Sequence, residues 1–189
     1  MSVALMADIF GITIRDPPEG WACLEALVLG KAINTEGRVV MFIRTTPEKL
    51  WNALMEPETT RKFWMGTHLE SDWKKGAAWK MIQADGRLTD AGEIVEIVPL
   101  QKLVLSWRHE HVPELKAEGV SRMTLEIESA GDTVKLTVVH EIDFPQSKLI
   151  KAVSGGWPKI LSSLKSLLET GEPIEDVRHW AKGCPGSQK

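Results

Sequence analysis

Tyrosine is absent from this chain of 189 residues, and cysteine occurs only twice. Cys23 and Cys184 lie near opposite ends of the chain, so they could pair only if both flanks met in space. In a cytoplasmic protein of this size, we interpret them as reduced structural thiols. The stretch from Met1 to Asp8 lacks the positively charged start of a secretory signal, which agrees with a cytoplasmic location.

An excess of one charge and long apolar runs are also absent. Lysine and arginine number 23 against 26 aspartates and glutamates, which gives a net charge of −3. The sequence therefore has no basic excess that would favour nucleic acid or an anionic membrane as a partner. Its apolar runs are far shorter than the roughly 20 residues of a membrane-spanning helix, so we expect no membrane span.

Motifs of the common catalytic machineries are missing as well. The sequence contains no phosphate-binding glycine loop, no nucleophile elbow, no zinc-peptidase helix and no Cys-x-x-Cys pair. Ser162 and Ser163 fall within an expected helix and have no obvious base nearby. The sequence thus indicates no bound metal or cofactor and favours a protein that is not an enzyme.

An apolar stripe near the C-terminus predicts one long amphipathic helix. Its apolar residues recur at three- and four-residue spacing and are Ile160, Leu161, Leu164, Leu167 and Leu168. Pro158 suits the first turn of this helix, and Gly171 suits its end. Such a helix must bury its stripe against the rest of the domain.

The chain before this helix reads mostly as short strands. Strands are expected at 38–44, 77–84, 87–98, 103–111, 121–128 and 133–142. Two short helices follow the first strand, one starting at Thr46-Pro47-Glu48 and one at Glu56-Pro57-Glu58. This order predicts an α+β protein in which a curved antiparallel sheet wraps around the long C-terminal helix.

Three regions are expected along the chain. Residues 1–37 form an N-terminal extension in which Trp21 to Leu29 could make one short helix. Residues 38–172 form the α+β domain, and residues 173–189 form a C-terminal tail. We see no internal repeat and no low-complexity segment.

The sheet and the helix should enclose a pocket whose lining follows from strand parity, because side chains alternate across a strand. The inner face of the first strand stays undecided, since both of its parities are apolar. Tryptophan and methionine favour an adaptable apolar cavity, although a filled core would explain each tryptophan about as well. The candidate ligand-binding residues are Trp64, Trp79, Met81, Trp107, His109, Met123, Leu125, Leu136, His140, Trp157 and Leu161.

Two histidine positions leave alternatives open. His140 ends an otherwise apolar inward row, so it could bond a backbone group, anchor a ligand or transfer protons. His109 and His111 share a strand parity and could ligate one metal ion, but no third ligand lies at a diagnostic spacing. We therefore interpret these two as a solvated strand end, with His109 as a second polar group for a ligand.

Several segments together resemble one protein family. They are IRTTPEKLW at 43–51, DWKKG at 72–76, LVLSW at 103–107, VVHE at 138–141, and GWP at 156–158 through ETG at 169–171. In order and spacing they are similar to bacterial proteins related to the activator of the heat-shock-protein-90 ATPase, within the START-like, helix-grip superfamily. The resemblance covers about residues 38–172. It implies a curved antiparallel sheet that grips the C-terminal helix, with an apolar cavity between them.

The resemblance also bears on function. In eukaryotic co-chaperones of this kind, a larger N-terminal domain makes much of the chaperone contact, whereas 37 residues precede the module here. We therefore expect non-catalytic binding of a small hydrophobic or amphipathic molecule, such as a lipid or an aromatic compound. The alternatives are a co-chaperone that activates a heat-shock-protein-90-type ATPase in a stress response, and a cyclase- or aromatase-like enzyme. A second copy of the chain and a chaperone are the protein partners that these alternatives imply.

Overall fold

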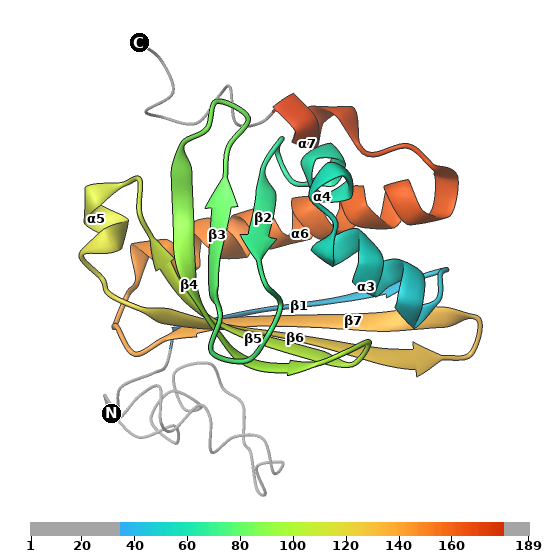
Figure 1. Cartoon of the computed structure of the whole chain (residues 1–189), viewed down its shortest axis with the longest axis horizontal. Coiled ribbons are helices and arrows are strands. Elements are labelled where there is room, and N and C mark those ends of the chain that lie inside the picture. The colour runs from blue at the N-terminus through green and yellow to red at the C-terminus, as the bar shows by residue number, and fades with distance from the viewer. Residues whose placement is uncertain (1–34, 180–189) are drawn as a thin grey trace, which may run out of the picture.

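The computed structural model describes residues 35–179 (Figure 1). Along the chain its elements are β1 (Thr35–Ile43), α3 (Pro47–Met55), α4 (Pro57–Phe63), β2 (His68–Ser71), β3 (Ala78–Ile82), β4 (Leu88–Val98), β5 (Lys102–His109), α5 (Pro113–Lys116), β6 (Ser121–Ala130), β7 (Thr133–Ile142), α6 (Lys148–Thr170) and α7 (Glu175–His179). Cys23, Cys184 and the short helix expected at 21–29 lie outside the described residues. Within that range, no helix combines the length and the apolar character needed to cross a bilayer.

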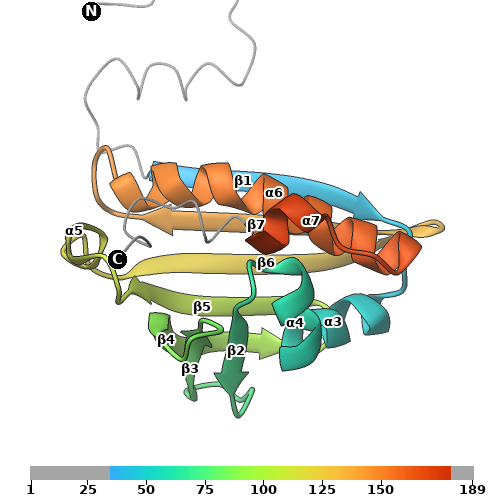
Figure 2. The ribbon, with the colours of Figure 1, turned by 90° about the horizontal axis from the view of Figure 1, so that it is seen from above.

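Seven strands form one antiparallel sheet in the order β1-β7-β6-β5-β4-β3-β2. The sheet curves, so that β4, β3 and β2 rise around the space above β5, β6 and β7 (Figure 1). Helix α6 runs along the inner side of the sheet, over β1 and β7 (Figure 2). Helices α3 and α4 cover the part of this inner side that α6 leaves open. This arrangement is the predicted α+β, helix-grip fold.

Strand register arranges the inner face in cross-strand rows. One row places Leu105 opposite Met123 and Met123 opposite His140. The next row places Trp107 opposite Ser121, towards the end of the sheet near α5. All five side chains are buried, as strand parity predicts.

The first strand presents its odd-numbered residues to the interior. Ile43 is fully buried, whereas Val40 and Phe42 are exposed on the outer face, which we define as the face away from α6. A Cβ atom on Gly37 would lie 2.5 Å from Oγ of Ser154 in α6. Glycine at this position thus leaves room for the Ser154 hydroxyl where helix and strand approach each other.

The start of α6 differs from the sequence prediction. The helix begins at Lys148, where Ser147 is the N-cap and its Oγ accepts from the backbone N–H of Ile150 at 3.0 Å. Pro158 lies inside the helix instead of in its first turn, so that prediction was wrong. Gly171 ends the helix in a left-handed conformation, as predicted.

The two helix starts after β1 are confirmed. Thr46 caps α3 by accepting from the N–H of Lys49 at 3.3 Å, and Pro47 occupies the first turn. Helix α4 is only seven residues long and lacks a side-chain hydrogen bond at its N-cap. It ends at Trp64 and is followed by two left-handed residues, Met65 at φ 53° and Gly66 at φ 74°. These two residues turn the chain into β2, a four-residue strand that the sequence pattern did not indicate.

Candidate functional site

The interior of the grip forms an apolar chamber between the sheet, α6 and the helix pair α3–α4. We use the name for the space lined by Leu54, Phe63, Trp64, Leu69, Leu103, Leu105, Trp107, Met123, Leu125, Trp157 and Leu161. Six of the predicted ligand-binding residues are in this set, namely Trp64, Trp107, Met123, Leu125, Trp157 and Leu161. Chamber residues as far apart in the sequence as Leu54 and Leu161 therefore meet at one place.

The four tryptophans singled out by sequence are in mutual contact. Trp64 meets Trp157 edge to face with ring centroids 5.2 Å apart, and Trp79 tilts against Trp107 at 4.6 Å. Trp107 also contacts Trp64 at 6.5 Å and Trp157 at 6.3 Å. Offset and edge-to-face pairs of this kind stabilise each other beyond simple burial, so the rings form one aromatic cluster.

The side chains that line the chamber nearly fill it. The remaining void measures about 10 Å³, which is room for about one water molecule. A molecule larger than water could enter only if part of the lining moved.

Larger hollows lie outside the grip: one of about 420 Å³ lies beside α6 and α7, and two lie on the outer face of the sheet. Of the two on the outer face, the first has a volume of about 410 Å³ and the second about 340 Å³, and both are bordered by Ser106 and the exposed Val120. Small residues such as Ala78, Ala91 and Gly92 form the floor of the first. Both hollows are open and contain none of the predicted ligand-binding residues.

His140 is fully buried beside the aromatic cluster, and both of its ring nitrogens have protein partners. Trp157 Nε1 lies 3.4 Å from Nδ1, and Ser121 Oγ lies 2.8 Å from Nε2. An indole N–H can only donate, so Nδ1 accepts and Nε2 of a neutral ring carries the proton. Nε2–H then donates to Ser121 Oγ, whose own proton goes to the carbonyl oxygen of Trp107 at 3.0 Å. The four groups form a fully satisfied chain.

Burial also sets the charge of His140. Removal from water lowers the pKa of His140 to about 4, and the negative charge of Asp90 opposes this shift only in part. The ring is therefore neutral at physiological pH, which agrees with the hydrogen-bond chain. A ligand that used His140 as an anchor would have to replace Trp157 or Ser121 as its partner.

A second polar group lies at the neighbouring end of β4 and β5. Oδ1 of Asp90 accepts from Trp107 Nε1 at 2.8 Å and lies 2.8 Å from His109 Nδ1. The side chains of Asp90 and His109 are 10% and 17% exposed. Nε2 of His109 is buried and has no hydrogen-bond partner among the described residues.

The remaining predicted residues surround the chamber without lining it. Trp79, Met81 and Leu136 are buried in the same core. The indole N–H of Trp79 donates a hydrogen bond to the carbonyl oxygen of Ser106. Sequence reasoning missed Asp90 and Ser121. An acidic residue within a strand-like run was a signal for Asp90, but its partners depend on the register of β4 and β5.

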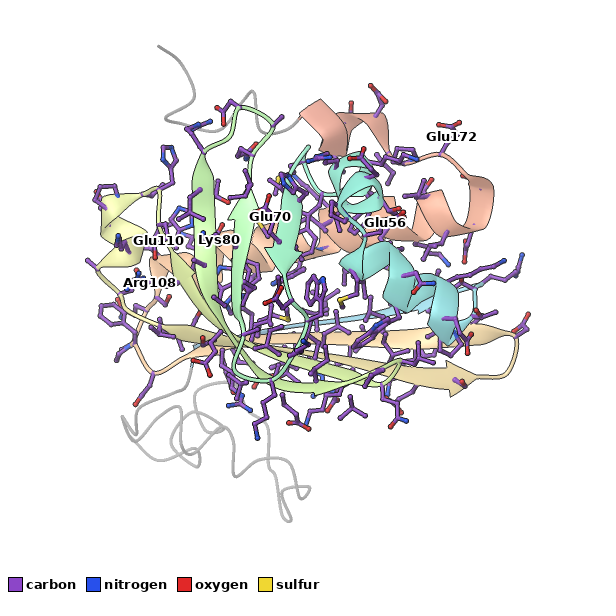
Figure 3. All side chains as sticks on the ribbon, in the orientation of Figure 1. Glu56, Glu70, Lys80, Arg108, Glu110 and Glu172 are labelled. Atoms are coloured by element: carbon purple, nitrogen blue, oxygen red, sulfur yellow. The ribbon has the colours of Figure 1, made fainter. Side chains whose placement is uncertain are left out.

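His109 and His111 do not converge. Nε2 of His111 lies 2.8 Å from Nη1 of Arg87 at the surface, whereas His109 faces Asp90. Between them, the Glu110 carboxylate binds Arg108 and Lys116, which ties the end of β5 to α5 (Figure 3). These ion pairs lower the pKa of Glu110, with the hydrogen bond from Lys116 as the largest cause. The i, i+2 spacing thus separates a partly buried histidine from an exposed one.

The chamber and the polar groups next to it differ in chemical character. The chamber is lined by apolar side chains and aromatic faces. The polar residues His140, Ser121, Asp90 and His109 form hydrogen bonds next to Trp107 and Trp157 without lining the chamber. Among the buried polar atoms of this group, His109 Nε2 alone lacks a hydrogen-bond partner within the described residues, and it can accept a hydrogen bond.

Comparison with known structures supports the fold. A solution structure of an Aha1 dimer from Colwellia psychrerythraea is similar at a TM-score of 0.59 and 16% identity, covering 72% of this chain and 97% of that one. The crystal structure of CalU16 from Micromonospora echinospora gives 0.59 at 18% identity over 78% and 82%. PFC0360w, described as an HSP90 activator from Plasmodium falciparum, gives 0.57 at 23% identity over 70% and 95%. At these identities the likeness concerns the fold.

Sequence comparison identifies the family. No curated protein matches the chain. The family model described as "Activator of Hsp90 ATPase homolog 1-like protein", however, matches residues 44–169, from the end of β1 almost to the end of α6. This range includes every predicted ligand-binding residue and two thirds of the chain. The chain therefore belongs to the family of Activator of Hsp90 ATPase homolog 1-like proteins.

Proposed function

We propose that this domain binds a small apolar or amphipathic molecule in the chamber between the sheet and α6, without chemical conversion. The observation that carries the proposal is the contact of four tryptophans at the apolar chamber, with the polar groups of His140, Asp90 and His109 next to Trp107 and Trp157. Such a lining suits a ligand with an apolar body and one polar head. The residues proposed to contact it or to shape its site are Trp64, Trp79, Met81, Trp107, His109, Met123, Leu125, Leu136, His140, Trp157 and Leu161.

Binding requires the chamber to open, because its void holds only about one water molecule. The wall formed by Phe63 and Trp64 is the best candidate to move. Phe63 is the last residue of a seven-residue helix without a side-chain cap at its N-terminus, and Trp64 is its C-cap. Two left-handed residues, Met65 and Gly66, follow. A non-glycine residue at positive φ stores strain that a rearranged turn would release. Ligand contact with Trp64 would repay the cost of displacing it by burying apolar surface, at roughly 25 cal/mol per Å².

Native mass spectrometry and dye binding test this proposal. The freshly purified protein should carry a small molecule, or it should bind an apolar naphthalene dye with a change in tryptophan fluorescence. Met123→Phe narrows the chamber and should weaken dye binding, whereas Phe42→Ala alters only an exposed side chain on the outer face. If Phe42→Ala abolishes dye binding and Met123→Phe does not, the dye binds the outer face and the proposal fails.

A second function is favoured by family membership. The matching family is described by its relation to an activator of Hsp90 ATPase, and the similar Plasmodium falciparum protein is described as an HSP90 activator. Activation of a heat-shock-protein-90-type ATPase by direct contact is therefore the competing proposal. An ATPase assay of such a chaperone with and without this protein distinguishes the two. Stimulation that persists in Met123→Phe would favour the chaperone contact over the chamber.

A further inference from the structure

The Asp90 carboxylate fixes the tautomer of His109. Its Oδ1 atom accepts the Trp107 indole N–H, which can only donate, and lies 2.8 Å from His109 Nδ1. With this oxygen acting as the acceptor, Nδ1 of His109 carries the proton and donates it to Asp90. The lone pair of a neutral His109 ring is then on Nε2.

This lone pair has no partner among the described residues, although the Nε2 atom is buried. Buried polar atoms in native proteins are nearly always hydrogen-bonded, so one without a partner requires an explanation. His140 on β7, two strands from β5, provides the contrast, since protein groups are bonded to both of its ring nitrogens. His140 is thus a fully buried imidazole with both nitrogens bonded, whereas His109 is a partly buried imidazole whose buried Nε2 retains a vacant acceptor.

His109 is close to the apolar chamber through Trp107. The two residues are at i and i+2 on β5, so their side chains share the inner face and are about 7 Å apart along the strand. The ring of Trp107 lines the chamber, and its N–H is bonded to the same carboxylate oxygen that orients His109. A molecule that reaches the Nε1 edge of the Trp107 ring would therefore lie close to the Asp90 carboxylate and the His109 imidazole.

We infer that His109 Nε2 is the acceptor for a neutral O–H group on the ligand, which makes the ligand class an apolar alcohol or phenol. This inference rests on the proposed function and assigns its polar contact. An O–H donor satisfies the vacant lone pair without burying a charge. A carboxylate head would place a second negative charge near Asp90 and would require a protonated imidazole. An ether or a pure hydrocarbon would leave Nε2 unpaired.

A matched set of probes tests the inference. 2-Naphthol, 2-methoxynaphthalene and 2-naphthoate share one ring system and differ in the head group. In titrations followed by tryptophan fluorescence, the wild type should bind 2-naphthol about fivefold more tightly than 2-methoxynaphthalene, the value of one net hydrogen bond. 2-Naphthoate should bind more weakly than 2-naphthol. His109→Leu should reduce the preference for naphthol to about one, while both neutral probes still bind.

The exposed His111 supplies the control variant. His111→Leu removes a histidine two residues away that bonds Arg87 at the surface, and it should leave the naphthol preference unchanged. Binding of both neutral probes with no preference, or a preference that survives His109→Leu, would overturn this inference and leave the proposed function standing. Failure of every probe to bind would overturn both.

If His109→Leu does not fold, nitrogen NMR of the wild-type protein gives the answer. The free protein should show a protonated Nδ1 and an unprotonated Nε2 for His109, and 2-naphthol should shift the Nε2 resonance of His109 more than 2-methoxynaphthalene does. A bound 2-naphthol that leaves that resonance in place would overturn the inference.

Discussion

The indole N–H of Trp79 donates to the carbonyl oxygen of Ser106 at 2.9 Å and thereby bridges from β3 across β4 to β5. The bridge passes over Gly92, where a Cβ atom would lie 1.9 Å from the Ser106 oxygen and 2.9 Å from Trp79 Nε1. The absence of a side chain at Gly92 therefore allows Trp79 to tie three strands together behind the aromatic cluster.

Gly92→Ala should destabilise the protein by about 3 kcal/mol or more. The new methyl group would collide with backbone atoms of Ser106, which cannot give way like a flexible side chain, and overpacking alone costs about 1–3 kcal/mol. Gly155→Ala in α6 is the control, because nothing lies within 4 Å of its Cβ position and alanine favours a helix by about 1 kcal/mol. Urea unfolding should give opposite signs for the two variants. Equal and small effects would mean that the Trp79 bridge is not rigid.

Leu164→Ala should cost about 2–5 kcal/mol of unfolding free energy. Leu164 is fully buried in the middle of the apolar stripe of α6, so the truncation loses transfer energy and leaves a cavity. Val40→Ala, on the exposed outer face, should cost well under 1 kcal/mol in the same denaturant titration. A loss below about 0.5 kcal/mol for Leu164→Ala would contradict the packing of α6 against the sheet.

Much of the fold follows from the sequence because its signals are local. Thr46-Pro47 starts α3 and the alternation over 133–142 gives β7, since cap chemistry and strand period need only neighbouring residues. The prediction of where α6 begins was wrong because it too relied on a local signal. Proline is favoured in a first turn, so Pro158 outweighed Ser147, although Ser147 is a good cap and apolar residues follow it at helical spacing.

Only part of the candidate site could be predicted from the sequence. Trp79 and Trp107 could be found because strand parity places both of them on the inner face of the sheet. Asp90 and Ser121 could not, because their roles arise from cross-strand partners. Asp90 becomes a hydrogen-bond acceptor only when the β4–β5 register brings it opposite His109, and Ser121 needs both the carbonyl oxygen of Trp107 and the ring of His140.

Glu118→Gln should destabilise the protein by about 1 kcal/mol at pH 7. The Glu118 carboxylate accepts from Ser147 Oγ at 2.5 Å, from the N–H of Lys148 at 2.8 Å and from the N–H of Leu149 at 3.2 Å, so it caps the N-terminus of α6. Burial raises the pKa of Glu118, but these hydrogen bonds lower it by more in sum. A carboxyl group whose pKa is lowered on folding stabilises the folded protein at pH values above its unfolded pKa of 4.5. This contribution disappears as the pH falls through the folded pKa.

Thermal or urea unfolding at several pH values measures the contribution of Glu118. The difference between wild type and Glu118→Gln should shrink below about pH 4. Glu114→Gln is the matched control, because the exposed Glu114–Lys148 ion pair nearby should contribute little. A larger loss for Glu114→Gln than for Glu118→Gln would show that the cap of α6 depends on another group.

His140 should make the protein less stable as the pH falls from 7 to 5. Burial lowers its folded pKa from 6.5 to about 4, so within this window the unfolded chain binds a proton that the folded protein does not. Stability therefore rises with pH between these two values, and the loss from pH 7 to pH 5 should be about 2 kcal/mol. His140→Gln cannot titrate and should lose this part of the pH dependence, although its stability at pH 7 should also be lower.

The informative quantity is the difference in slope between two variants in urea unfolding at pH 5, 6 and 7. His111→Gln removes an exposed histidine and should keep the slope of the wild type. His140→Gln should flatten the slope of stability against pH, because this substitution removes the titrating imidazole and leaves the other titratable groups in place. Parallel curves for wild type and His140→Gln would mean that the folded protein protonates His140 as readily as the unfolded chain does. The hydrogen bonds that link Trp157, His140 and Ser121 would then break in the folded state, and the neutral tautomer assigned to His140 would be wrong.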